Sequence, residues 1–299
     1  METSCGSVTR SPLQPSEASV VIACFNEAGT IGPTLDGLLA NFPNLEIIVV
    51  DDGSTDDCMG EIEQRRSVIL IRNNQNRGQG ASLVTGMKHA TRPYVIWYDA
   101  DGQHTPEMVA KVLAVQADFD CVIGLRSRHS DGMRQRRLGR WLLHVVARII
   151  TGAKVRDLNS GLRSFRREVI CKYWHLIPNR FSASTVTTIL MIERGFRVGW
   201  VDIDVQPRIG HSSLSQMRDG WRALALIVHL VTLFHPMRFF FPLAVSLIVG
   251  GACYGLVRAI FAGRGIPDLA VLVVLTGIQI LLFGLVSDQI SAIRKEKFE

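Results

Sequence analysis

The sequence contains no closely spaced pair of cysteines. Its six cysteines are scattered along 299 residues without CxxC or any other spacing typical of a metal site. This pattern argues against a disulfide framework or a thiolate-bound metal and predicts free thiols in a reducing compartment. The first residues are polar and lack the apolar run of a secretory signal. We therefore expect residues 1–17 to form a disordered lead-in and the polar part of the chain to stay in the cytosol.

The sequence also lacks the common nucleotide-binding fingerprints. It has no G-x-G-x-x-G and no Walker loop, which argues against a dinucleotide-binding or P-loop fold. Glycines do occur in NNQNRGQGASLVTGMKHA at 73–90, after the third apolar run. We expect Gly78 and Gly80 to allow a tight turn into a helix that begins at Gln79.

Negative charge is in the minority. There are 33 lysines and arginines against 27 acids, giving a net charge of +6, which favours an anionic partner. Between residues 126 and 167 only Asp131 and Asp157 oppose a dense set of basic side chains. These are Arg126, Arg128, Arg134, Arg136, Arg137, Arg140, Arg148, Lys154, Arg156, Arg163, Arg166 and Arg167. Without interleaved aromatics or a recognised binding module, nucleic acid is a poor explanation. Anionic lipid headgroups or a clamp for a phosphate group explain the cluster better.

Two long apolar segments close the sequence, at about 239–262 and 266–290. Each exceeds the ~20 residues that cross a bilayer, so 238–299 is predicted to hold a two-helix transmembrane hairpin and a cytoplasmic tail. Basic residues at both ends of the pair place those ends in the cytoplasm and predict a multi-pass protein of the inner membrane. A pair of buried core helices is the alternative. Residues 213–237, with GWRALALIVHLVTLF at 220–234, are predicted to form an interfacial amphipathic region.

The first 125 residues alternate apolar runs with helix-like stretches. The runs lie at 20–25, 45–52, 67–72, 94–99 and 120–125, and the helix-like stretches at 30–40, 55–65, 79–90 and 106–117. Strands without polar alternation, separated by helices, predict an α/β domain at 18–212 with a mostly parallel sheet and helices on both faces. Thr105-Pro106-Glu107 is a typical helix start.

Carboxylates follow several of these runs. Glu27 follows the first, Asp51 and Asp52 end the second, and Asp99 and Asp101 end the fourth. The carboxyl ends of parallel strands share one edge of a sheet, so these acids should gather there and attract a divalent cation such as Mg²⁺ or Mn²⁺. We expect Asp101 to bind the metal directly and Gln103 to add an amide oxygen. Asp99 would bind through water or contact a sugar hydroxyl. A solvated turn with two capping acids is the alternative.

Five motifs carry a resemblance to a known family. CFNEAGTI, VVDDGSTDD, NRGQGAS, DADGQH and DLNSGLRSF, in this order over about residues 18–215, resemble the family-2 glycosyltransferases with their GT-A-type fold. More narrowly, the chain is similar to the polyprenyl-phosphate glycosyltransferases, the group that contains dolichyl-phosphate mannose synthase and the bacterial bactoprenol glucosyltransferases. The C-terminal apolar hairpin suits the bactoprenol branch.

The resemblance implies a role for each matching position on the donor side. The nucleotide would be lined by Ala23, Phe25, Glu27 and Asp52, with Glu27 and Asp52 on the ribose or base. The family usually has proline where Ala23 stands. Asp99 and Ala100 would face the donor, while Asp101 and Gln103 would hold the metal on its diphosphate.

It also implies an acceptor-phosphate site at Arg126, Arg137 and Arg208, with Arg136 and Arg140 as rivals. The family usually has a lysine where Ser213 stands, so one cation is missing here. Asp157 would take part in catalysis by orienting the arginines or a sugar hydroxyl, and a helix-cap or turn acid is the alternative.

The expected activity is the inverting transfer of one hexose from a nucleotide-diphosphate sugar, with UDP-glucose preferred, to undecaprenyl phosphate at the cytoplasmic membrane face. A lipid phosphate is already ionised at neutral pH, so no catalytic base is needed. Alternatives are a GDP-mannose transferase of the dolichyl-phosphate type, a processive polysaccharide synthase, and a non-catalytic membrane adaptor. The synthase reading is weakened because Gln135 and Arg140-Trp141 do not form a QxxRW motif. A homo-oligomer, with a tetramer as one option, is expected from the small intramembrane contact.

Overall fold

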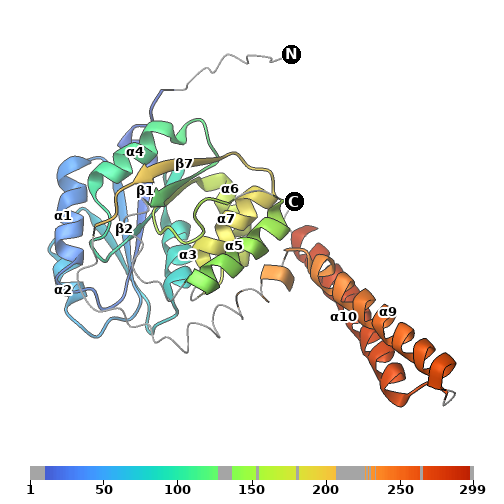
Figure 1. Ribbon diagram of the computed structural model, residues 1–299. Helices are drawn as coiled ribbons and strands as arrows, with labels where there is room; N and C mark the ends of the chain where they lie inside the picture. The colour runs from blue at the N-terminus through green and yellow to red at the C-terminus, as the bar shows by residue number, and fades with distance from the viewer. Residues whose placement is uncertain are drawn as a thin grey trace, which may run out of the picture. The chain divides into compact units, whose positions relative to one another are not determined.

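The computed structural model describes residues 11–126, 137–152, 155–179, 182–206, 226, 228, 230–232, 234–262 and 265–296 (Figure 1). The chain divides into two compact units. The first comprises Met1–Arg140 and Ala153–Leu214, and the second comprises Trp141–Gly152 and Ser215–Glu299. The five described cysteines, all but Cys5, are free thiols, as predicted.

A seven-stranded sheet forms the centre of the first unit, in the order β3-β2-β1-β4-β6-β5-β7. The predicted strands are present as β1 (Ala18–Cys24), β2 (Glu46–Asp51), β3 (Val68–Arg72), β4 (Tyr94–Asp99) and β5 (Cys121–Arg126). Two further strands, β6 (Arg163–Arg166) and β7 (Val198–Ile203), were not among those that the apolar runs predicted. The sequence RSFR of β6 has a single apolar residue and therefore no strand signal.

One strand runs against the others. β6 is antiparallel to both β4 and β5, whereas β1, β2, β3, β4 and the β5–β7 pair are joined in parallel. The predicted mostly parallel sheet is therefore confirmed, with one reversed strand inside it. Because β6 is reversed, it begins at the edge where its neighbours end, and the segment before it reaches the same edge.

Helices cover both faces of the sheet (Figure 1). One apolar core joins the strands to α1 (Ile31–Asn41), α2 (Cys58–Glu63) and α4 (Pro106–Gln116), and the other joins them to α3 (Gln79–His89), α6 (Arg167–Tyr173) and α7 (Ala183–Glu193). Consecutive residues of β1 serve the two cores in turn: Val20 and Ile22 the first, Val21 the second. Each such buried side chain stabilises the fold by about 1.5–3 kcal/mol, which explains why β1 is apolar at every position except Ser19. The helices cover both faces, as predicted.

The sheet reverses its strand order next to β1. The chain passes from β1 outward to β2 and β3, then returns to β4 on the other side of β1. In open α/β sheets the ligand crevice lies beyond the carboxyl ends of the strands at such a point. The residues that end β1 and β4 therefore define where a site should be sought.

Two long helices dominate the second unit, α9 (Pro236–Ala262) and α10 (Asp268–Glu296), and α5 (Arg137–Thr151) lies mostly in it. α9 and α10 pack closely through glycines, since a β-carbon at Gly277 would lie 3.0 Å from the carbonyl oxygen of Ala244. Both are long and apolar enough to cross a membrane, and only 17% of the most apolar window of each is buried. That exposure argues against the alternative of two buried core helices. Most of the predicted interfacial region, at 213–237, lies outside the described residues.

Candidate functional site

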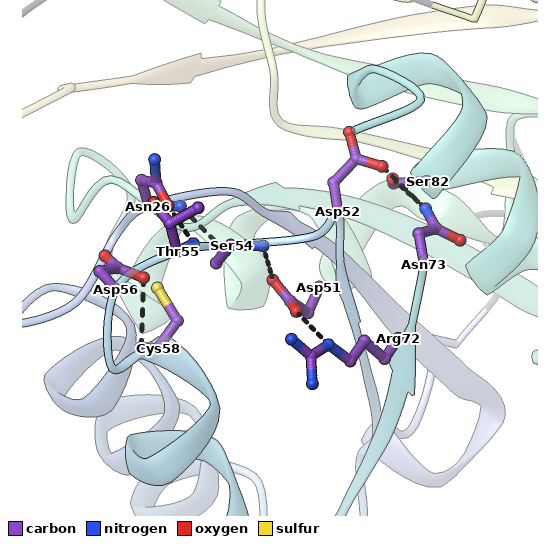
Figure 2. A network of polar contacts seen from close by, with 10 residues as sticks. All are labelled: Asn26, Asp51, Asp52, Ser54, Thr55, Asp56, Cys58, Arg72, Asn73 and Ser82. Atoms are coloured by element: carbon purple, nitrogen blue, oxygen red, sulfur yellow. Dashed lines mark hydrogen bonds and ion pairs between the residues drawn. The ribbon is translucent and has the colours of Figure 1, made fainter. Parts of the chain in front are cut away.

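Two loops at the rim of the sheet are joined by side-chain hydrogen bonds (Figure 2). The loop after β1 and the loop after β2 exchange contacts in both directions. The backbone N–H of Asn26 donates to Ser54 Oγ (3.0 Å), and the N–H of Thr55 donates to Asn26 Oδ1 (2.8 Å). The N–H of Ala28 donates to Asp56 Oδ2 (2.8 Å). Asn26 holds a left-handed backbone at φ 54°, which asparagine tolerates better than most residues. The hydroxyl and carboxylate side chains of GSTDD, at residues 53–57, therefore hold the loop after β1 in place at this edge of the sheet.

Three of the predicted nucleotide residues lie at the end of β1. Ala23 lies opposite Asp99 in the β1–β4 register, and Phe25 follows with 42% of its surface exposed. Glu27 is half-buried, its N–H donates to Cys58 Sγ (3.0 Å), and its carboxylate accepts from Thr30 Oγ1 (3.3 Å). The loop thus leaves the aromatic side chain of Phe25 partly exposed just beyond the end of β1.

The two acids that end β2 are both buried but point to different partners (Figure 2). Asp51 accepts from the N–H of Ser54 (3.0 Å) and lies 3.6 Å from Arg72 Nε. Asp52 accepts from Asn73 Nδ2 (2.8 Å) and from the backbone N–H groups of Arg77 (3.0 Å) and Gly78 (2.7 Å). In this structure Asp52 therefore shapes the glycine turn, which the sequence did not indicate.

That turn has the predicted geometry. Gly78 is the N-cap of α3 with φ 99°, a conformation that L side chains rarely adopt. Gly80 is needed for a different reason, because a β-carbon there would overlap the carbonyl oxygen of Pro178. Gly78 thus confirms the turn, and Gly80 allows a close packing contact.

Asp99 ends β4 and is held from several sides. Its Oδ1 accepts from Gln79 Nε2 (3.1 Å), and its Oδ2 lies 3.9 Å from the buried His104 Nδ1. A β-carbon on Gly161 would overlap the carboxylate, so the backbone there lies directly against Asp99. With 28% of its side chain exposed, Asp99 still faces solvent at the centre of the rim.

The next turn carries Asp101 and Gln103, and it is tied to the exit of β7. The N–H of Gln103 donates to Asp101 Oδ1 (3.2 Å). Gln103 Nε2 donates to the carbonyl of Gln206 (3.2 Å), whose own N–H donates back to the carbonyl of Gln103 (3.0 Å). With its nitrogen engaged, the side-chain oxygen of Gln103 remains for a cation.

This donor set fits a hard divalent cation. In the described part of the chain no group of three or more His, Cys, Asp or Glu side chains could hold a metal. Asp101 and Gln103 supply oxygen only, which matches the preference of Mg²⁺ and Mn²⁺ for a few protein oxygens completed by water and phosphate. An oxygen donor set of this size would leave most of the coordination of a cation to water and phosphate.

Arg126, at the end of β5, forms an ion pair with Asp157. Its Nε lies 3.0 Å from Oδ2 and its Nη2 lies 3.3 Å from Oδ1. Asp157 Oδ1 also accepts from the N–H of Asn159 (2.8 Å). Burial alone would raise the pKa of Asp157, but the bonds from Arg126 and Asn159 outweigh it, and the pKa lies below its usual value. Asp157 is thus an ionised partner of Arg126, and it also acts as a turn acid.

The structure does not describe the side chains of the other predicted acceptor residues. Arg137 begins α5, and its side chain lies outside the described residues, as do Arg208 and Ser213.

Arg163 and Arg166 prove to be part of the fold. Arg163 is fully buried, and Arg166 Nε lies 3.2 Å from Asp120 Oδ1. The two therefore do not belong to a freely exposed basic cluster. Arg163 on β6 is buried in the core, and Arg166 on the same strand forms an ion pair with Asp120.

Some contacts at the rim have no signal in the sequence, although Gln79 and Gly161 lie within the motifs NRGQGAS and DLNSGLRSF. Gln79, Gly161 and Gln206 contact predicted site residues only because the fold brings distant segments together. His104 was visible in DADGQH, but its burial against the ring of Tyr98, at 5.4 Å between centroids, was not. Long-range contacts of this kind leave no periodic pattern.

Comparison with known proteins places the chain in a family. Residues 19–174 match glycosyl transferase family 2, which is just over half of the chain, and residues 235–293 match the GtrB C-terminal hairpin. The chain belongs to glycosyltransferase family 2. This membership makes the protein an enzyme that transfers sugars, with the GtrB hairpin as its C-terminal part.

Similar proteins support the assignment over most of the chain. An uncharacterized protein of Methanocaldococcus jannaschii, MJ1222, is 35% identical over 64% of this chain and 82% of its own. The undecaprenyl-phosphate 4-deoxy-4-formamido-L-arabinose transferase of Shewanella sediminis is 27% identical over 92% of this chain and 87% of its own. The predicted family is therefore confirmed, including the polyprenyl-phosphate branch among the relatives.

A solved structure shares the fold of the first unit. Glucosyl-3-phosphoglycerate synthase of Mycobacterium tuberculosis, crystallised with Mn²⁺, UDP and phosphoglyceric acid, superposes with a TM-score of 0.59 at 21% identity. The match covers 75% of this chain and 83% of that one. The GT-A-type architecture predicted from the motifs is confirmed.

Proposed function

We propose that this glycosyltransferase moves one hexose, with inversion, from a nucleotide-diphosphate sugar to the phosphate of a polyprenyl lipid. The observation that carries the proposal is the presence, in one chain, of a family-2 match at residues 19–174 and a GtrB-type hairpin at residues 235–293. A membrane-embedded hairpin would hold the enzyme where a long polyprenyl chain resides. Undecaprenyl phosphate is the proposed acceptor, by analogy with the undecaprenyl-phosphate transferase of Shewanella sediminis.

The donor binds in the crevice beyond β1 and β4. Phe25 and Ala23 offer an exposed ring and adjacent backbone for the base, and Glu27 lines the base or ribose. Asp52 is buried and holds the glycine turn, so it acts on the base or ribose only through that turn. Asp99 and Ala100 face the sugar and diphosphate. UDP-glucose is the preferred donor, and the fold neighbour crystallised with UDP and Mn²⁺ supports testing UDP-sugars first.

Asp101 and Gln103 hold the cation, either Mg²⁺ or Mn²⁺. When bound, such a cation offsets the charge that develops on the departing nucleotide diphosphate. Asp101 contributes the carboxylate, and the bond from Gln103 Nε2 to the Gln206 carbonyl fixes the amide group whose oxygen is proposed to bind the cation. Asp99 acts beside it by orienting the donor.

The acceptor phosphate binds to arginine. Arg126 presents its planar guanidinium to the phosphate, and Asp157 fixes its orientation through the two-point ion pair. Arg137 and Arg208 are the further cations proposed for this phosphate. The lipid phosphate carries its own negative charge at neutral pH, so one of its oxygens attacks the anomeric carbon without a base on the protein.

The catalytic domain is proposed to face the cytoplasm at the inner membrane, with α9 and α10 crossing the bilayer as the two spans of a multi-pass protein. The basic residues near both ends of the pair support this orientation. Because two spans offer little contact within the membrane, we also propose that protomers associate, with a tetramer as the arrangement to test first.

The test is transfer of label into lipid. Purified full-length protein in detergent is incubated with undecaprenyl phosphate and a panel of labelled nucleotide sugars, with Mn²⁺, with Mg²⁺ or with EDTA. We expect one sugar per lipid from one donor, only with a cation. A polymer in the product would instead favour a processive synthase. No product from any donor, and no effect of the cation on nucleotide binding, would favour a non-catalytic adaptor.

A further inference from the structure

A buried arginine lies directly behind the rim. Arg163, the first residue of β6, has none of its surface exposed, although it is one of the largest side chains in the core. Its guanidinium carbon lies 5.8 Å from the centroid of the Trp97 ring on β4. Nothing in the proposed chemistry so far uses this residue.

The guanidinium joins two segments that are distant in sequence. Nε and Nη2 both donate to the carbonyl of Ser160 (3.1 and 2.6 Å), in the loop that precedes β6. Nη1 donates to the first turns of α7, with its bonds ending on the carbonyl of Ser184 (2.6 Å), Thr187 Oγ1 (2.8 Å) and Thr188 Oγ1 (3.1 Å). Each of these acceptors is an uncharged oxygen.

Such an arrangement is costly for stability alone. Burying a cation costs several kcal/mol unless its partners compensate, and an apolar side chain of similar volume would often fill the space at no loss. Burial lowers the pKa of Arg163 to about 10, so the group is still charged at neutral pH. A forked, charged group in this place is explained better by the geometry it imposes than by the free energy it contributes.

The loop that Arg163 holds has a site residue at each end. Asp157 pairs with Arg126 at one end, and at the other the Gly161 backbone lies against the carboxylate of Asp99. Between them, Asn159 Oδ1 accepts from Thr185 Oγ1 of α7 (3.0 Å). A shift of the Ser160 carbonyl would therefore move the contact with Asp99 and loosen the support of Asp157.

We propose that Arg163 is a positioning residue that ties the 157–161 loop to α7 and thereby sets the spacing between Asp99 and the Arg126–Asp157 pair. The inference rests on the proposed function, in which Asp99 faces the donor and Arg126 the acceptor phosphate. Arg163 touches neither substrate. It acts through Ser160 and α7 to keep the two halves of the site in line for displacement.

Lysine cannot replace this fork. A planar guanidinium reaches both segments at once with donors in fixed directions, whereas an ammonium group concentrates its donors at one point. Arg163→Lys keeps the charge but should still lose the hydrogen bonds to one of the two segments, the 157–161 loop or α7. This makes it the informative variant, because a merely electrostatic role would survive the change.

The experiment compares full-length Arg163→Lys with Arg166→Lys. Arg166 lies on the same strand and pairs with Asp120, away from the 157–161 loop, so it controls for loss of any β6 arginine. We expect Arg163→Lys to lower kcat for label transfer to undecaprenyl phosphate by about tenfold or more, since small misplacements of reacting groups are costly. Binding of UDP with Mn²⁺ should be unchanged, because the hydrogen bonds of Arg163 end on the 157–161 loop and on α7 rather than on the loops after β1 and β2. Unchanged kcat, or a parallel loss of UDP binding, would overturn the proposal.

Hydrogen–deuterium exchange supplies a measurement independent of activity. In Arg163→Lys, exchange should speed up in peptides covering 157–162 and 183–193 and stay unchanged in 46–58. Unchanged exchange at 157–162 would contradict the positioning role even if the wild type transferred no sugar, in which case the proposed function alone would fail. If Arg163→Lys does not fold, the double variant Thr187→Val/Thr188→Val, which removes two acceptors of the fork, is expected to show the same pattern more weakly.

Discussion

Arg126 and Asp157 meet through two parallel contacts, 3.0 Å from Nε to Oδ2 and 3.3 Å from Nη2 to Oδ1. The Asp157 side chain is 12% exposed and the Arg126 side chain 38%, so the acid is the more buried partner of the pair. A guanidinium fixed from behind presents its remaining N–H groups in one direction. This is the geometry that a phosphate receptor requires, and it makes Asp157 a test of the acceptor site.

Asp157→Asn should weaken acceptor binding more than donor binding. The amide cannot provide two accepting oxygens, so Arg126 loses its fixed orientation. We expect the KM for polyprenyl phosphate to rise by about tenfold, which corresponds to about 1.4 kcal/mol, with the KM for the nucleotide sugar unchanged. Steady-state kinetics with each substrate varied in turn would decide this. A rise confined to the donor KM would count against the acceptor assignment.

The same ion pair predicts a pH dependence of stability. The pKa of Asp157 in the folded protein lies below its ordinary value of 3.8, so the unfolded chain takes up the proton first. The contribution of the pair is therefore present in full well above pH 3.8 and is lost as the pH falls through the lower folded value. The melting temperatures of wild type and Asp157→Asn should differ at pH 7 and converge as the pH falls below the pKa of Asp157 in the folded protein. A constant difference across that range would contradict the ion-pair account.

Asp101→Asn should remove transfer while leaving the fold intact. It keeps the size of the side chain and removes the charge that we assign to the cation. We expect label transfer to fall by at least about 100-fold, the scale found when a group that stabilises developing charge is lost. Asp202→Asn, at an exposed position of β7, is the matched control and should be near wild type. Turnover retained in Asp101→Asn would remove Asp101 from the metal site.

Gly161→Ala tests the contact behind Asp99. The added methyl would overlap the Asp99 carboxylate, so the loop or the acid must move. We expect a loss of stability of about 1–3 kcal/mol together with a fall in kcat. Gly37→Ala is the control, since its β-carbon would make an ordinary contact 3.4 Å from Pro106 Cγ in the same unit. Denaturant unfolding and label transfer measure the two effects, and equal behaviour of the two variants would show that the contact is unimportant.

Asp52→Ala should open the glycine turn before α3. The carboxylate is buried and serves three donors, of which two are backbone N–H groups that would be left without a partner. A fully buried donor left unsatisfied costs about 1–3 kcal/mol. These two N–H groups are part-buried, so a loss at the lower end of that range, seen as a drop in melting temperature, is expected along with a higher donor KM. Asp36→Ala is the control. It breaks an ion pair with Arg65 in which the Asp36 side chain is 61% exposed, so it should lower the free energy of unfolding by less than about 1 kcal/mol. A normal melting temperature in Asp52→Ala would refute the structural role.

Much of the fold could be predicted because its signals are local. Five strands and their helices were visible as apolar runs with turns between them, and Thr105-Pro106 marked the start of α4 correctly. β6 escaped because its four residues include two arginines and a serine, whose burial depends on partners elsewhere. A reversed strand with no apolar pattern is visible only after its neighbours have formed the sheet.

The same distinction between local signals and long-range contacts applies to the candidate site. The sequence by itself determined that acids follow β1, β2 and β4, since each strand's apolar run ends at them, and that an apolar hairpin closes the chain. Only the tertiary structure decided that Asp157 pairs with Arg126, that Gly161 lies against Asp99, and that Arg163 is fully buried. Hydropathy and turn preference act between neighbours in sequence, whereas these contacts join residues that the reversed strand and α7 bring together through packing.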